Sequence, residues 1–197
     1  MITSSPIRPS SAQYSWRVLP NRRSADLAIA HAAYLRHVDP HQRRGPLYLA
    51  LARFSATKAG GWLSVNVAWK LDPHLLKLTR GRLSTALPLR AALLETRGAR
   101  TGRLRRNATL YFHDGDRVTI VPSLRGWQRN PDWYYNLLNH PDVVYGGLPF
   151  RAVVVEDGGE RERLWDLADR VYPQYSAFRE QAAKAGRTVP IVQLVPR

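Results

Sequence analysis

The residues most able to do chemistry lie in one short stretch, residues 97–106, which holds five arginines together with Gly98 and Gly102. Arginine presents a planar fork of N–H donors that matches phosphate and carboxylate groups, and glycine lets a backbone approach a ligand closely. The hydroxyl of Thr101 adds a further hydrogen-bonding group. This composition predicts a cradle for a phosphate or another polyanion. A solvated basic hairpin, whose glycines serve only its turns, is the alternative interpretation.

A second set of candidate residues follows the next predicted strand. Ser123 stands at the end of that strand, and a short loop leads to a predicted helix that carries Trp133, Tyr135 and Asn136. Backbone N–H groups at such a junction often point at a ligand, and the aromatic side chains could flank a flat ring. Trp133 could equally belong to the core. Asn136 is a turn former in mid-helix with no capping role, which indicates that its side chain has a specific partner.

Other catalytic and metal-binding signals are weak. The chain has no cysteine, so a disulfide, a thiolate metal site and a cysteine nucleophile are excluded. Its six histidines are dispersed and match no metal-ligand spacing, so we expect no metal. The sequence contains neither a P-loop nor a dinucleotide-binding glycine motif.

The net charge is +15, from 30 Lys and Arg against 15 Asp and Glu in 197 residues. Such an excess points to an anionic partner, which could be nucleic acid, anionic lipid or an acidic small molecule. Residues 1–88 hold 13 of the cations but only 3 of the acids, so most of the excess lies in the first part of the chain. The length and the 44% hydrophobic content predict one globular domain with an appendage.

The hydrophobic pattern divides the chain into three parts. Residues 1–20 are rich in Ser and Pro and are expected to form a flexible arm. Residues 21–88 form a predicted helical N-terminal extension, with helices over 24–38, 46–58 and 72–78, the last with Asp72 as its N-cap. Residues 89–197 form the domain that carries the candidate site.

In this last part the hydrophobic period changes from about 3.6 to about 2. Strands are predicted over 90–96, 106–113, 117–123, 142–145, 149–156 and 189–195, and the Asp114-Gly115-Asp116 turn predicts a hairpin. One helix is predicted over 131–140 and one or two between 160 and 186. The expected fold is α+β, a six-stranded and mostly antiparallel barrel with helices between strands.

Residues 89–197 resemble the family of deazaflavin (F420)-dependent nitroreductases and quinone reductases. The resemblance rests on the order and spacing of Gly98-Ala-Arg100-Thr101-Gly102, Arg105, Asp114-Gly115, Ser123-x-x-Gly126, Pro131-x-Trp133-Tyr134-x-Asn136 and Tyr172-Pro-x-Tyr175. It implies a split β-barrel that binds coenzyme F420, a deazaflavin whose tail carries a phosphate and several glutamates. It also implies an oxidoreductase that transfers a hydride from the reduced coenzyme to a quinone, a nitroaromatic or a similar acceptor.

The resemblance assigns roles to individual residues. The phosphate would be held by Arg100 and Arg105 with Thr101 and Gly102, and Ser123 and Tyr175 would bind or protonate the acceptor. The deazaflavin would be lined by Asn107, Ala108, Pro122, Ser123, Trp133 and Asn136. The sequence departs from the family pattern at Arg125, where a glycine is expected, at Ala108, where proline is usual, and at Phe178, where some relatives have a tyrosine.

Other classes of protein stay open at this point. One is a non-catalytic module that binds nucleic acid through its basic surface, which is disfavoured because no nucleic-acid motif is present. Another is a split-barrel protein that binds flavin mononucleotide or heme. No apolar run approaches the roughly 20 residues that span a bilayer, so we expect a cytoplasmic protein. Its basic front section would pack on the barrel or on a second subunit of a homodimer, or make peripheral contact with anionic lipid at the inner membrane face.

Overall fold

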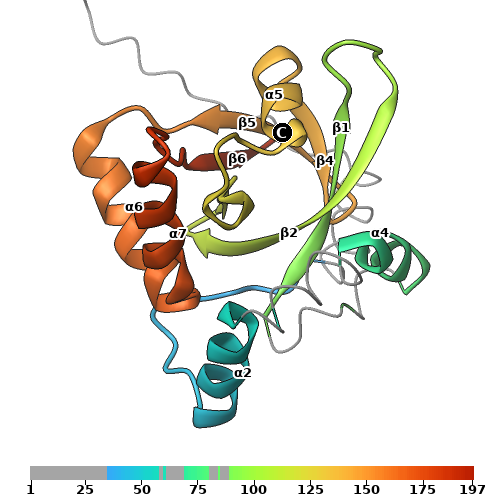
Figure 1. Ribbon diagram of the computed structural model, residues 1–197. Coiled ribbons are helices and arrows are strands. Elements are labelled where there is room, and N and C mark those ends of the chain that lie inside the picture. Colours follow the sequence, from blue (N-terminus) through green and yellow to red (C-terminus); the bar gives the residue numbers. More distant parts are fainter. Residues whose placement is uncertain (1–34, 58–59, 61–68, 80–83, 85–88) are drawn as a thin grey trace, which may run out of the picture.

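A closed barrel of six strands lies at the centre of the protein (Figure 1). The computed structural model describes residues 35–57, 60, 69–79, 84 and 89–197. The strands are β1 (Ala91–Arg97), β2 (Leu104–Asp114), β3 (Arg117–Ile120), β4 (Asp142–Tyr145), β5 (Leu148–Val154) and β6 (Val192–Pro196). They close in the order β1-β2-β3-β6-β5-β4 with every neighbouring pair antiparallel, which confirms the predicted fold class.

The strands follow the alternation of side chains in the sequence. In β1, Ala92, Leu94 and Thr96 are buried, whereas Leu93 and Glu95 between them are partly exposed. This is the pattern of a strand with one face on a core. The β2–β3 hairpin turns at Gly115, whose φ of +59° suits glycine, and Asp114 pairs with Arg117 across the turn. The predicted hairpin is therefore confirmed.

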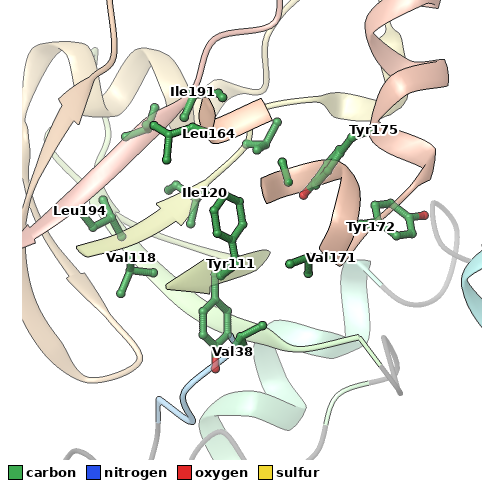
Figure 2. Packing of buried hydrophobic residues seen from close by; sticks show 14 of the residues in the cluster. Val38, Tyr111, Val118, Ile120, Leu164, Val171, Tyr172, Tyr175, Ile191 and Leu194 are labelled. Carbon is green, nitrogen blue, oxygen red and sulfur yellow. The ribbon is translucent and has the colours of Figure 1, made fainter. Parts of the chain in front are cut away.

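The hydrophobic core fills the barrel and continues under two helices, α6 (Gly158–Val171) and α7 (Gln174–Lys184). Figure 2 shows Ile120 and Leu194 of the barrel near Leu164 of α6, and all three belong to one buried cluster. The Asp157 side chain caps α6 by accepting a hydrogen bond from the Glu160 N–H. Because the buried cluster joins the barrel to α6 and α7, these two helices cover one side of the barrel, as Figure 1 shows.

Among the described residues, three further helices pack on the barrel or on α7. Helix α5 (Asp132–Asn139) packs against β1, and α4 (Trp69–Leu78) packs against β1 and β2. Helix α2 (Pro46–Ala56) packs against α7, and its Tyr48 hydroxyl donates a hydrogen bond to the Val171 carbonyl. In Figure 1, α5 lies at one end of the barrel beside the β1–β2 hairpin, and α2 lies at the opposite end. Among the described residues, no helix is long and apolar enough to cross a bilayer.

The helix predicted over 24–38 is wrong in its last residues. Residues 35–38 are not helical. The Val38 N–H donates to His113 Nδ1 at 3.0 Å, and the Val38 carbonyl accepts from the His113 N–H at 2.9 Å. Val38 is buried against the barrel, so this segment bonds to β2 instead of continuing a helix. Residues 24–34, and the predicted arm over 1–20, lie outside the described residues.

Other predicted boundaries are also wrong, including those of the strand predicted over 189–195, which begins at Val192, and of the strand predicted over 149–156, which ends at Val154. The strand predicted over 117–123 ends at Ile120, because the next residues turn away from the barrel into a short 3-10 helix, η2 (Leu124–Gly126). The helix predicted from Asp72 begins one turn earlier at Trp69, which leaves Asp72 buried inside α4, where it accepts a hydrogen bond from the Ser84 hydroxyl. The helix predicted over 46–58 is confirmed as far as Ala56.

Candidate functional site

The arginine-rich stretch forms the turn between β1 and β2, which we call the arginine turn, residues 97–106. Its backbone is held by two short hydrogen bonds, from the Gly98 N–H to the Arg103 carbonyl and from the Gly102 N–H to the Gly98 carbonyl, both 2.8 Å. A Cβ at Gly98 would lie 3.1 Å from Thr101 Oγ1, and Gly102 has a φ of +64°. Both glycines are therefore required by the turn itself.

Asn136 of α5 fastens this turn to the barrel. Its Oδ1 accepts a hydrogen bond from the Ala99 N–H at 2.9 Å, and its Nδ2 donates to Thr96 Oγ1 at 3.0 Å. Asn136 is buried, so the loss of these bonds would leave buried polar groups unpaired. Within residues 98–103, the N–H groups of Arg100 and Thr101 make no hydrogen bond to the described protein. They remain available to an anion.

The register of β1 and β2 separates the charges of Arg105 and Arg106. Arg106 lies opposite Glu95, and the two side chains form an ion pair of 2.7 Å. Arg105 lies opposite Thr96, whose side chain is buried. Paired residues of an antiparallel ladder share a face of the sheet, so Arg105 is on the same face as Thr96, and its own side chain is exposed. Among the described residues, the other arginines of the turn have no carboxylate partner: Arg97, Arg100, Arg103 and Arg105.

The first half of β2 has an open edge. Strand β1 pairs with β2 along Leu104–Leu110, but β3 pairs with β2 only from Tyr111 onward. In the described part of the chain, no strand covers the other edge of residues 104–110. The half-buried Asn107 and Ala108 lie in the middle of this edge. An edge of this kind offers backbone N–H and carbonyl groups to a ligand, and it begins at the arginine turn.

The segment that leaves β3 continues from Pro122 into η2. Its residues Leu124, Arg125 and Gly126 all have positive φ, of 40°, 56° and 79°. Gly126 is needed because a Cβ there would lie 2.7 Å from the Phe178 carbonyl oxygen. For Arg125 the left-handed conformation costs about 1–2 kcal/mol, which explains why a glycine is expected at this position. The Arg125 guanidinium lies 5.6 Å from the centre of the Phe178 ring, a contact that offsets part of this cost.

The two predicted substrate-side residues, Ser123 and Tyr175, have different surroundings. Tyr175 is buried in an aromatic cluster with Trp165, Tyr172 and Phe178, and Figure 2 shows it beside Tyr172 at the start of α7. Burial raises the pKa of Tyr175 well above its usual range, so its hydroxyl stays protonated at neutral pH. Ser123 is half-buried in the segment between β3 and η2, and its hydroxyl makes no hydrogen bond within the described residues.

The predicted ring-lining residues come from three elements. Asn107 and Ala108 lie on the open edge of β2, whereas Pro122 and Ser123 lie on the segment that follows β3. Trp133 of α5 is only 8% exposed and belongs to the core cluster. Its large indole therefore supports the helix that carries Asn136.

Sequence reasoning missed Arg187, which lies beyond the end of α7. Its guanidinium donates to the carbonyls of Pro122 and Ser123 and to Asn130 Oδ1. No pattern in the sequence singles out this arginine, because its partners lie more than 50 residues away in the chain.

Together these features define a class of protein. A closed antiparallel barrel carries an arginine turn without carboxylate partners for four of its arginines, and an open edge of β2 begins at that turn. Such an arrangement has the charge and the free hydrogen-bonding groups that an anionic small molecule requires. The family model described as F420H(2)-dependent quinone reductase matches residues 70–196. The chain belongs to this family.

The chain is also similar to individual proteins. An F420H(2)-dependent quinone reductase of Mycobacterium tuberculosis is 29% identical over 147 residues, which are 69% of this chain and 97% of that protein. A second protein of the same organism, to which the same activity is provisionally assigned, is 35% identical over 114 residues, or 56% and 92% of the two chains. The solved structure of an F420-H2-dependent reductase has 27% identity and a TM-score of 0.47, and the match covers 53% of this chain and 92% of that one.

Proposed function

We propose that this protein is an oxidoreductase that uses reduced coenzyme F420 to reduce a quinone, a nitroaromatic or a similar acceptor. The observation that carries the proposal is the arginine turn at the start of the open edge of β2, in a chain of the F420H(2)-dependent quinone reductase family. Neither a nucleic-acid module nor a protein that binds flavin mononucleotide or heme gains support from the family or its relatives.

The residues of the turn fit a coenzyme with a phosphate and an acidic tail. Arg100 and Arg105 have no carboxylate partner among the described residues, so their charge is free for an anion. The N–H of Thr101 is also free in the described turn, and Gly102 leaves open space where a Cβ would be. We assign these four residues to the phosphate, because charge-assisted hydrogen bonds from a rigid turn are the strongest way to hold it.

The flat ring is proposed to lie along the open edge of β2. Asn107 and Ala108 would line one side of it, and Pro122 and Ser123 would line its end. Trp133 and Asn136 would close the pocket from α5, although both side chains are already engaged in packing or hydrogen bonds. When bound, the reduced deazaflavin supplies the hydride equivalent, and the protein supplies binding and orientation.

On the acceptor side, we assign Ser123 and Tyr175 to bind or protonate the oxygen of the reduced acceptor. The Ser123 hydroxyl has no partner in the described structure, so it can donate to an acceptor oxygen. Tyr175 is protonated at neutral pH because burial raises its pKa. The Phe178 ring lies 6.4 Å from the Tyr175 ring and also contacts the Arg125 guanidinium. Tyr175 therefore needs a rearrangement of this aromatic cluster to reach the acceptor.

The coenzyme assignment is tested by a fluorescence titration of oxidised F420 and by the absorbance loss of F420H2 with menadione as acceptor. We expect Arg100→Ala and Arg105→Ala each to raise the Kd by about tenfold or more, since each removes a charge-assisted contact. Arg106→Ala is the matched control and should change the Kd by less than about threefold, because an exposed ion pair contributes little. Equal affinities in all three variants would refute the cradle, and absence of F420 binding to wild type would refute the function.

We also propose that the protein makes peripheral contact with an anionic membrane through α2. Leu47, Leu51 and Phe54 share one face of this helix and are 71%, 39% and 51% exposed. Arg53 of the same helix and Arg43, three residues before the helix begins, are also exposed. An apolar stripe bordered by cations suits the interface of an anionic bilayer, where a quinone acceptor would be met. Co-flotation with anionic vesicles tests the proposal.

A further inference from the structure

The guanidinium of Arg187 hydrogen-bonds to uncharged oxygens of the protein and forms no ion pair with a described carboxylate. Its Nη2 donates to the Ser123 carbonyl at 2.7 Å, and its Nη1 donates to the Pro122 carbonyl at 3.3 Å and to Asn130 Oδ1. Its Nε is buried without a hydrogen-bond partner. No described carboxylate forms an ion pair with Arg187. The guanidinium is thus compensated only by neutral oxygens.

The backbone of Arg187 is held firmly. Its N–H donates to the Ala182 carbonyl at 2.9 Å, and the Gly186 N–H donates to the Ala183 carbonyl at 2.9 Å. Gly186 has a φ of +70°. This is the arrangement that ends many helices with a left-handed glycine. The side chain of Arg187 therefore extends from a rigid base, the end of α7.

The partners of Arg187 are the segments that border the proposed coenzyme site. Pro122 and Ser123 follow β3, and Asn130 precedes α5, the helix whose Asn136 fastens the arginine turn. The Ser123 carbonyl also accepts a hydrogen bond from the Gly126 N–H at 2.8 Å, at the start of a segment with three positive φ angles. A segment in such an unfavourable conformation persists only when its surroundings hold it. Arg187 is one of the groups that hold it.

We propose that Arg187 is a positioning residue of the active site, which orients Pro122 and Ser123 toward the open edge of β2 and ties them to the loop before α5. The proposal rests on the proposed function. The forked guanidinium suits this task because one side chain reaches three oxygens on two segments. Its role is indirect, since every contact that it makes is to protein.

The test compares Arg187→Ala with Arg161→Ala. Arg161 is a matched control because its guanidinium, like that of Arg187, donates to a backbone carbonyl. Its acceptor is the Val189 carbonyl at 3.0 Å, and it has no hydrogen bond to residues 121–130. We expect Arg187→Ala to raise the Kd for oxidised F420 by about tenfold, because the loss of a charged hydrogen-bond donor loosens the wall of the site. We expect Arg161→Ala to keep the wild-type Kd.

Two measurements separate positioning from a general loss of structure. Amide hydrogen exchange of residues 123–130 should accelerate in Arg187→Ala by about tenfold, with exchange in β4 and β5 unchanged. Guanidinium ion at a non-denaturing concentration should restore the affinity of Arg187→Ala, whereas NaCl at equal ionic strength should not. Failure of the guanidinium ion to improve the affinity, or acceleration of exchange throughout the barrel, would overturn the proposal.

A second variant keeps the proposal testable if Arg187→Ala does not fold. Asn130→Ala removes one oxygen that Arg187 contacts and leaves the guanidinium in place. It should weaken coenzyme binding in the same direction by a smaller factor. If wild-type protein binds F420, and Asn130→Ala and every folded Arg187 variant bind it with the same Kd, the positioning role is refuted. That result leaves the proposed function intact. Wild-type protein that does not bind F420 refutes both.

Discussion

Arg105 and Arg106 are neighbours in the chain with different surroundings. Arg106 is paired with Glu95 across the ladder, whereas Arg105 lies opposite the buried Thr96 and has no carboxylate partner among the described residues. The charge that matters for binding an anion is therefore the charge that the protein leaves uncompensated. Net charge alone does not distinguish the two residues.

Asn136 gives a prediction at this scale. Asn136→Leu removes both bonds from the side chain and leaves Thr96 and the Ala99 N–H without their partner. We expect the free energy of unfolding to fall by about 1–3 kcal/mol, and the affinity for F420 to fall with it because the arginine turn loosens. Urea unfolding and F420 titration measure the two effects.

The control for this variant is Asn139→Ala, on the same helix, where the exposed side chain donates only to the Tyr135 carbonyl. It should change stability and affinity little. If Asn136→Leu loses coenzyme affinity at wild-type stability, then Asn136 acts by direct contact with the coenzyme, as the family resemblance implies, and its hold on the turn is unimportant.

At the scale of elements, β2 is the element that organises the site. Its second half, from Tyr111 onward, pairs with β3, whereas its first half, residues 104–110, pairs only with β1. The difference arises because the chain after β3 turns away at residue 121 and packs on α7 through Gly126. The arginine turn and the open edge therefore follow one another along β2, and the segment with Ser123 leaves β3 next to the point where the open edge ends.

Helix α2 gives the prediction at this scale. The triple variant Leu47→Gln, Leu51→Gln and Phe54→Gln keeps good helix formers but removes the exposed apolar face. We expect wild type to float with vesicles that contain anionic lipid and not with neutral vesicles, and the triple variant to float several-fold less. The physical reason is that exposed apolar area and nearby cations both contribute to interfacial binding.

The control is the double variant Leu138→Gln and Val153→Gln, which removes exposed apolar side chains from other faces of the molecule. It should float as wild type does. Equal flotation of the wild type and the triple variant would contradict the membrane proposal. Light scattering that shows a wild-type dimer and a triple-variant monomer, with no flotation of either, would assign the face to a second copy of the chain.

At the scale of the whole molecule, His113 connects the segment before α2 to the barrel. Its Nδ1 accepts the Val38 N–H, and its ring lies 4.4 Å from that of His37. Burial and the neighbouring His37 lower the pKa of His113 from 6.5 to about 4. The folded protein therefore favours neutral His113, which is the form that can accept this hydrogen bond.

This shift predicts a pH dependence of stability. The unfolded chain binds the proton first, so the contribution of His113 is fully present above pH 6.5 and is lost as the pH falls toward about 4. His113→Gln keeps an acceptor but does not titrate, so its Tm should change less with pH in this window than that of wild type. His74→Gln, on the exposed face of α4, is the control. Parallel curves for wild type and His113→Gln between pH 6.5 and 4 would contradict the prediction.

Much of the barrel could be predicted from the sequence because its signals are local. The alternation of buried residues in β1, the Gly115 hairpin turn and the proline that begins α2 each depend on a few neighbouring residues. The family resemblance, which rests on the spacing of such residues, is likewise readable from the chain alone. The helix predicted over 24–38 fails in its last residues because Val38 bonds to a residue 75 positions away.

The amino-acid sequence by itself determined the strand pattern, the basic charge and the family of this protein. Only the tertiary structure decided which arginines are uncompensated, where β2 is left open, and that Arg187 holds the strand end near Ser123. The physical reason is that these features depend on strand register and on contacts between residues far apart in the chain. Hydrophobic period and turn chemistry report only the local conformation of the backbone.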